Sequence, residues 1–279
     1  MRRLVSVLLV LVLCIYYSMP VWAVSTLRRQ DLTARRVIAI CFDSGLDLFV
    51  YDADIPHAPA SMTKMMVVYL VYEAMAQGLF TADCAVPISA LAQRTSQDAA
   101  QTNVRLTQTR TYTVGQLLDI IIVASAGGAT LALAEFIGGS VYGFLQKAND
   151  KIDEWGIHAF MQSAVGGTLP TFFTPRAMAE LTRNSILFYP QILERTGATA
   201  VYFHGVRFPH PMAQRFPGMD GFKTGSHSVA RFNYAGTAYQ DGHRIITVVM
   251  GSATADSRFR DTARLMQYGF AVIREGRYE

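Results

Sequence analysis

The 279-residue chain has few of the residues that build metal or disulfide sites. It contains three cysteines and six histidines, with no C-x-x-C pair and no H-E-x-x-H segment. Zinc sites are commonly built from such closely spaced ligands, so we expect neither a metal nor another cofactor. The glycine-rich segments also lack the G-x-x-x-x-G-K-[ST] pattern that cradles a nucleotide phosphate.

Neither sign of charge dominates the composition. Lysine and arginine number 25 against 21 aspartates and glutamates, which gives a formal net charge of +4. A nucleic-acid partner would require a larger and more clustered basic excess, so none is expected. Hydrophobic residues make up 51% of the chain, which is typical of a globular protein with a substantial core.

A marked apolar run lies at the N-terminus. Arg2 and Arg3 precede it at residues 4–17, and the small residue Ala23 follows. This order is typical of a secretory signal peptide over residues 1–23, and the alternative is an uncleaved anchor that tethers the protein to a membrane. Both interpretations predict an exported protein of the periplasm or cell envelope. Cleavage would remove both arginines and lower the net charge from +4 to +2.

The remaining cysteines, Cys41 and Cys84, leave two alternatives open. They pair in an oxidising compartment, or both remain thiols.

Strand-like runs are concentrated toward the two ends of the chain. The predicted strands cover residues 36–42, 46–51, 222–225, 233–239 and 245–250, with hairpin turns at Asp43-Ser44-Gly45 and Asp241-Gly242. The predicted helices cover residues 61–78, 113–123, 129–137, 141–155, 175–188 and 256–270. This order predicts an α+β fold, in which both chain ends build one antiparallel sheet and a helical insertion lies between them.

Ser61-Met62-Thr63-Lys64 is the sharpest short motif in the sequence. At the start of a helix, residues three apart lie on one face, so the Lys64 amine can reach the Ser61 hydroxyl. A lysine whose pKa is lowered by burial or by neighbouring cations can take the hydroxyl proton. The free N–H groups at the helix start favour the negative charge that develops on a reacting carbonyl. The pattern predicts a nucleophilic serine with lysine as its general base.

A second motif, Lys223-Thr224-Gly225, follows about 160 residues downstream. Glycine at this position lets a substrate backbone come close to the strand edge. Between the two motifs, two buried helices are interrupted at Ser125, followed by Gly127 and Gly128. Each glycine costs a helix roughly 1 kcal/mol relative to alanine, which accounts for the break. An S-x-x-K motif, a serine at a break and a K-T-G motif together predict serine acyl transfer.

With these motifs, residues 35–272 resemble the D-alanyl-D-alanine carboxypeptidase family of low-molecular-mass penicillin-binding proteins, serine peptidase family S11. The stretches that carry the resemblance are Asp43-Ser44-Gly45, 58–64, 132–135, 174–176, 220–225 and 248–251. The resemblance implies a three-layer β-lactamase/transpeptidase-like fold, with a sheet flanked by helices. One penicillin-binding domain is expected over residues 24–279, with a helical subdomain at about 78–190 and no C-terminal β-domain.

The resemblance also implies roles for the candidate site residues. Ser61 is the acylated nucleophile, Lys64 its general base and Ser125 a proton relay. The ligands would be peptidoglycan stem peptides and β-lactams. Binding of the peptide carboxylate and of the oxyanion is assigned to Lys223, Thr224, Arg258 and the N–H groups of Ser61 and Ser226, beside Gly225.

The sequence departs from the family at Gly127. The family's middle motif is Ser-x-Asn, whereas this chain has Ser125-Ala126-Gly127 and therefore lacks the amide that touches the catalytic lysine. Asn233 is no obvious replacement, and Arg231 is bulkier than the glycine usual there, which would narrow the cleft. Two interpretations remain open: an active exported carboxypeptidase, or a catalytically impaired homologue that binds peptidoglycan or a cell-wall partner. A β-lactamase is a weaker alternative, because no Glu-x-x-x-Asn segment is found.

Overall fold

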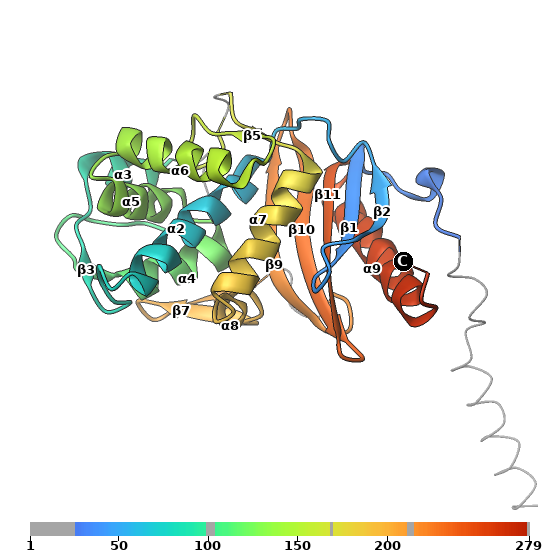
Figure 1. Ribbon diagram of the computed structural model, residues 1–279. Coiled ribbons are helices and arrows are strands. Elements are labelled where there is room, and N and C mark those ends of the chain that lie inside the picture. Colours follow the sequence, from blue (N-terminus) through green and yellow to red (C-terminus); the bar gives the residue numbers. More distant parts are fainter. Residues whose placement is uncertain (1–25, 99–103, 168–169, 211–214, 278–279) are drawn as a thin grey trace, which may run out of the picture.

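The computed structural model describes residues 26–98, 104–167, 170–210 and 215–277. The signal peptide predicted at residues 1–23, and the tether at 4–17, lie outside the described residues. The main sheet has five antiparallel strands in the order β2-β1-β11-β10-β9 (Figure 1). Their bounds are Arg36–Cys41 (β1), Asp47–Tyr51 (β2), Met219–His227 (β9), Arg231–Gln240 (β10) and His243–Ser252 (β11).

The sheet joins the two ends of the described chain, as the strand pattern predicts. Strand β1 pairs with β11 so that Arg36 lies opposite Met250. The turn between β10 and β11 has positive φ at both Asp241 (51°) and Gly242 (84°), the conformation that a two-residue type I′ turn requires. The predicted antiparallel sheet and the α+β fold class are confirmed.

Helices cover both faces of this sheet (Figure 1). The α-helices of the described residues are α2 (Lys64–Ala76), α3 (Ala90–Thr95), α4 (Val114–Ala124), α5 (Gly127–Gly138), α6 (Val141–Trp155), α7 (Pro175–Phe188), α8 (Ile192–Thr196) and α9 (Ala255–Arg274), of which α3, α5 and α6 lie beside the sheet (Figure 1). Helix α9 packs on one face, and α7 crosses the other face against β1 and β11. Alternate residues of β11 therefore enter different cores: Ile246 and Val248 on the α7 side, Ile245 and Val249 on the α9 side. A strand covered on both faces reads as a continuous apolar run, as residues 245–250 do.

Local signals place the helix ends. Thr113 accepts a hydrogen bond from the N–H of Gln116, whose side chain accepts from the N–H of Thr113, so the predicted capping box begins α4. Helices α6 and α7 have the bounds that the sequence predicts.

Sequence patterns missed the short elements. These are the short helices α3 and α8, the 3₁₀ turn η2 (Arg29–Asp31), and three two-stranded ribbons: β3 (Ala85–Val86) with β4 (Tyr112–Thr113), β5 (Ala159–Phe160) with β6 (Phe172–Phe173), and β7 (Ala200–Phe203) with β8 (Val206–Pro209). The start of the helix predicted at 61–78 is a 3₁₀ turn, η3 (Ala60–Thr63). The ribbon β7–β8 packs against α4. Its residue Phe203 stacks on Tyr112 with 5.7 Å between ring centroids.

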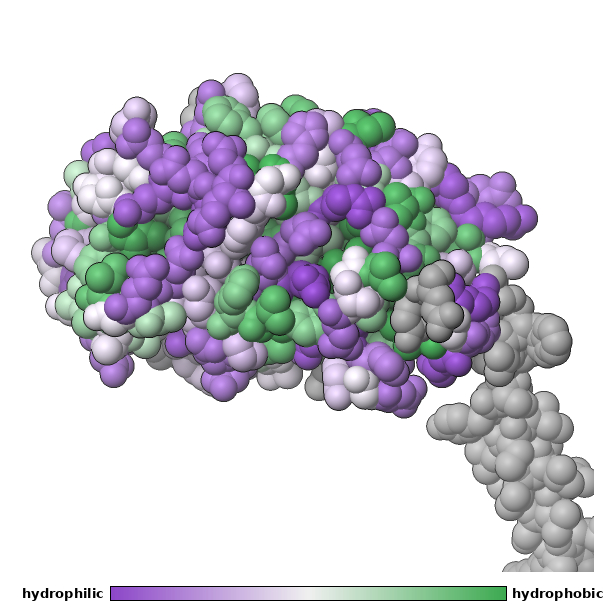
Figure 2. All heavy atoms as spheres, in the orientation of Figure 1, coloured by the Kyte–Doolittle hydropathy of each residue, from purple (hydrophilic) through white to green (hydrophobic). Residues whose placement is uncertain are grey.

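The surface carries a mixture of polar and apolar residues. Figure 2 shows one face on which hydrophilic residues predominate and hydrophobic ones form small separate groups. Across the described ranges, no single helix is both long and apolar enough to cross a membrane. One bent pair, α5 with α6, passes that test by length and composition only. Cys41 and Cys84 are both free thiols, so the structure contains no bridge between them.

Candidate active site

The serine–lysine pair lies where the chain enters α2. Ser61 belongs to the 3₁₀ turn η3, and Lys64 is the first residue of α2. Residues three apart eclipse one another in a 3₁₀ turn, which brings Lys64 Nζ to 2.7 Å from Ser61 Oγ. The same amine donates to the Val165 carbonyl at 2.9 Å. The contact between Ser61 and Lys64 is therefore the one that the S-x-x-K spacing predicts, with Val165 as a partner that the sequence did not indicate.

Lys64 is buried, with 1% of its surface exposed. Burial penalises the charged ammonium and lowers the pKa of Lys64 from 10.5 to about 7. A substantial fraction of this lysine is consequently neutral near pH 7, the form that can accept a proton.

A second lysine–serine pair faces the first. Its lysine lies on the sheet, and its serine lies between two helices. Ser125 lies between α4 and α5 with a left-handed φ of 57°, an uncommon conformation for a non-glycine residue. Its Oγ accepts a hydrogen bond of 3.0 Å from Lys223 Nζ, on strand β9. Burial, then the charges of Lys64 and Arg258, lower the pKa of Lys223. Lys223 is therefore close enough to Lys64 for their charges to interact. Ser61, Lys64, Ser125 and Lys223 form one cluster.

The break between the two helices lies at Ser125, as the sequence predicts, but the two glycines do not form it. The helical path is interrupted at Ser125 and Ala126, whereas Gly127 and Gly128 form the first turn of α5. Gly128 is required by packing, because a Cβ there would lie 2.5 Å from Ser96 Cβ and 2.6 Å from the Ala92 carbonyl oxygen. The explanation of the break by helix-breaking glycines is therefore wrong, since the left-handed Ser125 makes the turn.

Gly225 has a packing role within the chain itself. A Cβ on Gly225 would lie 2.3 Å from the Pro59 carbonyl oxygen and 3.0 Å from the Met62 amide nitrogen. The backbone that approaches β9 at this point is therefore the turn carrying Ser61. This contact sets the distance between the turn that carries Ser61 and the K-T-G strand, and it differs from the substrate contact that the sequence suggested.

Replacement of Gly225 by alanine should separate these two elements. We expect Gly225→Ala to lose about 1–3 kcal/mol of stability, as overpacked interiors usually do, and to react more slowly at Ser61. Thermal denaturation and the rate of labelling by a fluorescent penicillin measure the two effects. Gly167→Ala is the matched control, because among the described residues its Cβ would approach Ser163 Oγ alone, at 3.9 Å. Equal behaviour of the two variants would contradict this prediction.

Arg258 borders the cluster from the first turn of α9. Its guanidinium lies 4.6 Å from the Phe259 ring centroid and 5.8 Å from that of Phe232. Burial, then the charge of Arg215, lowers the pKa of Arg258 to about 10, so the side chain stays charged at neutral pH. Its Nε is buried without a hydrogen-bond partner in the described structure. Arg258 therefore adds a positive charge to the cluster, close enough to act on Lys223.

Asn233 is fully engaged elsewhere, in agreement with the interpretation that it does not replace the missing amide. It donates to the Ala58 carbonyl at 2.8 Å and accepts from the Gly251 N–H at 2.8 Å. Strands β10 and β11 are thereby tied to the segment that leads to Ser61. Arg231, at the start of β10, has a left-handed φ of 57°, and Ser226 lies opposite Phe232 in the pairing of β9 with β10.

A pocket of about 330 Å³ opens beside the second lysine–serine pair. Its lining comes from the end of α4, strand β9 and the end of β8, and consists of Ile122, Val123, Ala124, Ser125, Phe208, Pro209, His210, Lys223 and Thr224. His210 is a lining residue that the sequence did not indicate, because a lone histidine beside prolines carries no recognisable pattern.

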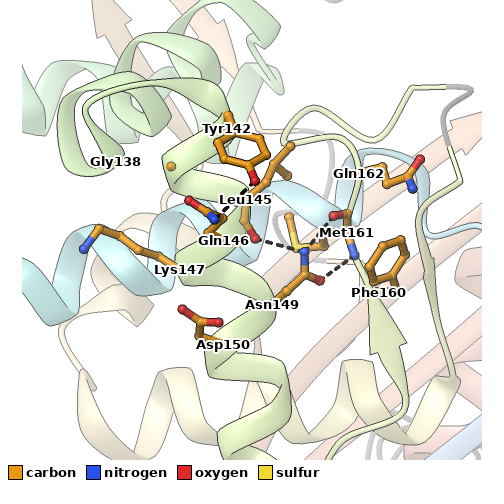
Figure 3. Close-up of a pocket in the computed structure, with 11 residues that line it drawn as sticks. Gly138, Tyr142, Leu145, Gln146, Lys147, Asn149, Asp150, Phe160, Met161 and Gln162 are labelled. Atoms are coloured by element: carbon orange, nitrogen blue, oxygen red, sulfur yellow. Dashed lines mark hydrogen bonds between the residues drawn. The ribbon is translucent and has the colours of Figure 1, made fainter.

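A larger hollow of about 840 Å³ lies between α6 and β5 (Figure 3). Its central polar residue, Asn149, hydrogen-bonds the backbone of Leu145 and Met161 and so holds β5 against α6. None of the candidate catalytic residues lines this hollow. Within the described part of the chain, no group of three His, Cys, Asp or Glu side chains is placed to hold a metal ion.

An antiparallel sheet covered by helices, with Ser61 at the start of a buried helix beside a K-T-G strand, defines the class of penicillin-binding and D,D-transpeptidase folds. The sequence profile of the Peptidase S11 family, described as D-alanyl-D-alanine carboxypeptidase, matches residues 23–254. The chain belongs to this family, which confirms the resemblance found in the sequence.

Individual relatives and solved structures are similar to this chain over most of its length. The chain is 27% identical to the D-alanyl-D-alanine carboxypeptidase DacF of Bacillus subtilis, covering 97% of this chain and 72% of the relative. Against other curated carboxypeptidases it spans 61–64% of their length, less than two thirds. A crystal structure of a peptidoglycan synthesis regulatory factor (PBP3) from Streptococcus pneumoniae has a TM-score of 0.81 and 32% identity, covering 86% of this chain and 74% of the other. The ampicillin-bound penicillin-binding protein D2 of Listeria monocytogenes has a TM-score of 0.76 and 26% identity, covering 88% and 99%.

Proposed function

We propose that this chain is an exported serine D-alanyl-D-alanine carboxypeptidase that acts on peptidoglycan stem peptides and is acylated by β-lactams. The observation that carries the proposal is the contact of 2.7 Å between Ser61 Oγ and the amine of the buried Lys64. The chain's membership of the S11 family supports the substrate class, and the ampicillin-bound relative supports the ligand class.

The proposed reaction begins with proton transfer. Neutral Lys64 accepts the proton of Ser61 as Ser61 Oγ attacks the carbonyl carbon of the penultimate D-alanine. The backbone N–H groups of Ser61 and Ser226 stabilise the oxyanion. Thr224 and Arg258 hold the terminal carboxylate, for which the planar guanidinium is well suited.

The second half of the reaction uses the other lysine–serine pair. Ser125 donates its proton to the leaving nitrogen when the C–N bond breaks, and D-alanine leaves. The proton that Lys64 took from Ser61 then returns to Ser125 through Lys223, whose amine lies 3.0 Å from Ser125 Oγ, and leaves Lys64 neutral. Water next attacks the ester carbonyl as Lys64 takes its proton, the bond from the acyl carbon to Ser61 Oγ breaks, Oγ receives that proton, and the shortened peptide leaves with a free carboxyl group. The experiment that tests the proposal is twofold: a fluorescent penicillin should label Ser61, and free D-alanine should appear from a peptide ending in D-Ala-D-Ala.

Gly127 favours a second candidate function. It supplies no amide side chain beside Ser125, so a homologue that binds peptidoglycan with weakened catalysis is the alternative. Labelling without release of D-alanine would favour this alternative, and rapid turnover of the penicillin would favour a β-lactamase.

Restoring the amide should accelerate acylation. Gly127 has a helical backbone without positive φ, so asparagine can adopt the same conformation. We expect Gly127→Asn to be acylated faster by at least about tenfold, because one oriented donor at a reacting centre is typically worth 10²–10³ in rate. Stopped-flow labelling with a fluorescent penicillin measures the rate.

The neighbouring glycine provides the control for this variant. Gly128→Asn should lose stability because of the close contacts with Ser96 and Ala92, and should gain no rate. An unchanged rate in folded Gly127→Asn protein would mean that the pocket functions without the amide.

A further inference from the structure

A buried histidine lies beside the second lysine–serine pair and has no part in the reaction described above. His210 follows β8 directly and is 7% exposed. Its backbone N–H donates to the Thr199 carbonyl at 2.8 Å, and its Nδ1 lies 2.9 Å from the Ala198 carbonyl oxygen. The first contact holds the backbone of His210 in place, and the second orients its ring.

The hydrogen bond to Ala198 determines which ring nitrogen carries the proton. A carbonyl oxygen only accepts, so Nδ1 must be the donor, and Nε2 of the neutral ring is then an acceptor. Burial, then the positive charge of Lys223, lowers the pKa of His210 below its usual value of 6.5. The neutral ring with an unprotonated Nε2 is therefore the form present at neutral pH. In the described part of the chain, no hydrogen bond to Nε2 is found.

The ring lines the pocket of about 330 Å³ together with Ser125, Lys223 and Thr224. Phe208 and Pro209 form an apolar wall of the same pocket. At about 330 Å³, the pocket holds more than a single methyl group.

The chemistry of this lining restricts what lies there. A lone pair on Nε2 repels a carboxylate, which is instead attracted to Arg258 and the lysines. A hydroxyl or an amide group can donate a hydrogen bond to Nε2 and also occupy part of the pocket. If the proposed function holds, the ligand group next to Ser125 belongs to the leaving residue, because Ser125 protonates the leaving nitrogen.

We propose that His210 is a specificity-determining residue of the Ser61 site, whose Nε2 accepts a hydrogen bond from a hydroxyl or amide group on the side chain of the leaving residue. The chain would then favour stem peptides whose last D-residue carries such a donor over those that end in D-alanine. This inference rests on the proposed function for the orientation of the ligand.

The test compares two tripeptides that differ by one hydroxyl group, ending in D-Ala-D-Ser and in D-Ala-D-Ala. Binding is measured by calorimetry in the Ser61→Ala background, where no turnover consumes the peptide. We expect the D-serine peptide to bind about tenfold more tightly, the effect of one net hydrogen bond. His210→Phe should abolish the difference, and His210→Gln, which keeps an acceptor oxygen, should retain part of it. His243→Phe, at the far end of β11, is the matched control and should keep the full preference.

Two results overturn the inference: equal affinities in the Ser61→Ala protein, or a preference that survives in His210→Phe. Thermal denaturation of His210→Phe shows whether the ring is also needed for folding. If His210→Phe does not fold, the loss of the preference is measured in His210→Gln instead. The proposed function is judged separately, by release of the D-amino acid from both peptides by the protein with Ser61 intact. A preference in binding without release would contradict the proposed function and support the role of His210. Binding of neither peptide would overturn the inference, while penicillin labelling of Ser61 would still decide the function.

Discussion

Ser61→Ala protein should carry no penicillin adduct, even after long incubation. The acyl-enzyme requires an oxygen nucleophile at this position, and the alanine variant has none. Ser61 Oγ is the hydroxyl that lies 2.7 Å from Lys64 Nζ. In the protein that keeps Ser61, intact-protein mass spectrometry should detect the added mass of one penicillin, and peptide mapping should place it on Ser61.

Ser44→Ala serves as the control for this substitution. Ser44 lies in the β1–β2 turn, where its hydroxyl accepts from the Leu46 N–H, so the variant should be labelled like the unmodified protein. An adduct on Ser61→Ala would place the nucleophile elsewhere. Absence of any adduct on the unmodified protein would leave the impaired homologue as the better description.

Removal of Lys64 should slow acylation by about 10²- to 10⁴-fold, the usual contribution of a general base. Lys64→Met keeps most of the buried aliphatic volume and removes the amine. The rate of penicillin labelling against pH provides an independent readout. Since the amine must be neutral to accept a proton, the rate should rise as pH rises through about 7 and level off above it.

Lys64→Met should lose this pH dependence together with the rate. Lys151→Met is a suitable control, because Lys151 forms ion pairs with Glu73 and Glu154 on the helical side and touches no site residue. A pH profile that is flat through 7 in the unmodified protein would argue against Lys64 as the base. So would a profile that is retained in Lys64→Met.

Much of the fold could be predicted from periodicity and caps. Helices α6 and α7 and the two main hairpins have strong local signals: Ser140 and Thr174 as caps, and turns with residues that favour positive φ. The ribbons such as β7–β8 could not, because their stability comes from packing on α4 rather than from their own pattern.

The candidate site could be predicted in part. The spacing of Ser61 and Lys64 determines their contact, since both lie in one turn. The contact of Ser125 with Lys223 joins residues 98 positions apart and depends on the whole sheet. The resemblance assigned both residues to one site, whereas no local property of the sequence did. Val165 contributes only its backbone carbonyl, and His210 is a single histidine, so neither has a signature that a pattern could show.

The pairing of the first strand with the last also determines the order in which this protein can fold. Strand β1 pairs on one side with the neighbouring β2, but its partner on the other side, β11, is residues 243–252, about two hundred positions later in the chain. Closing such a large loop has a high entropic cost, and chains dominated by distant contacts fold slowly. The helices between α2 and α7 can form early from local contacts, whereas the sheet that places Lys223 beside Ser125 assembles last. Until the C-terminal strands arrive, a nascent chain has Ser61 and Lys64 but not the strand that completes the candidate site.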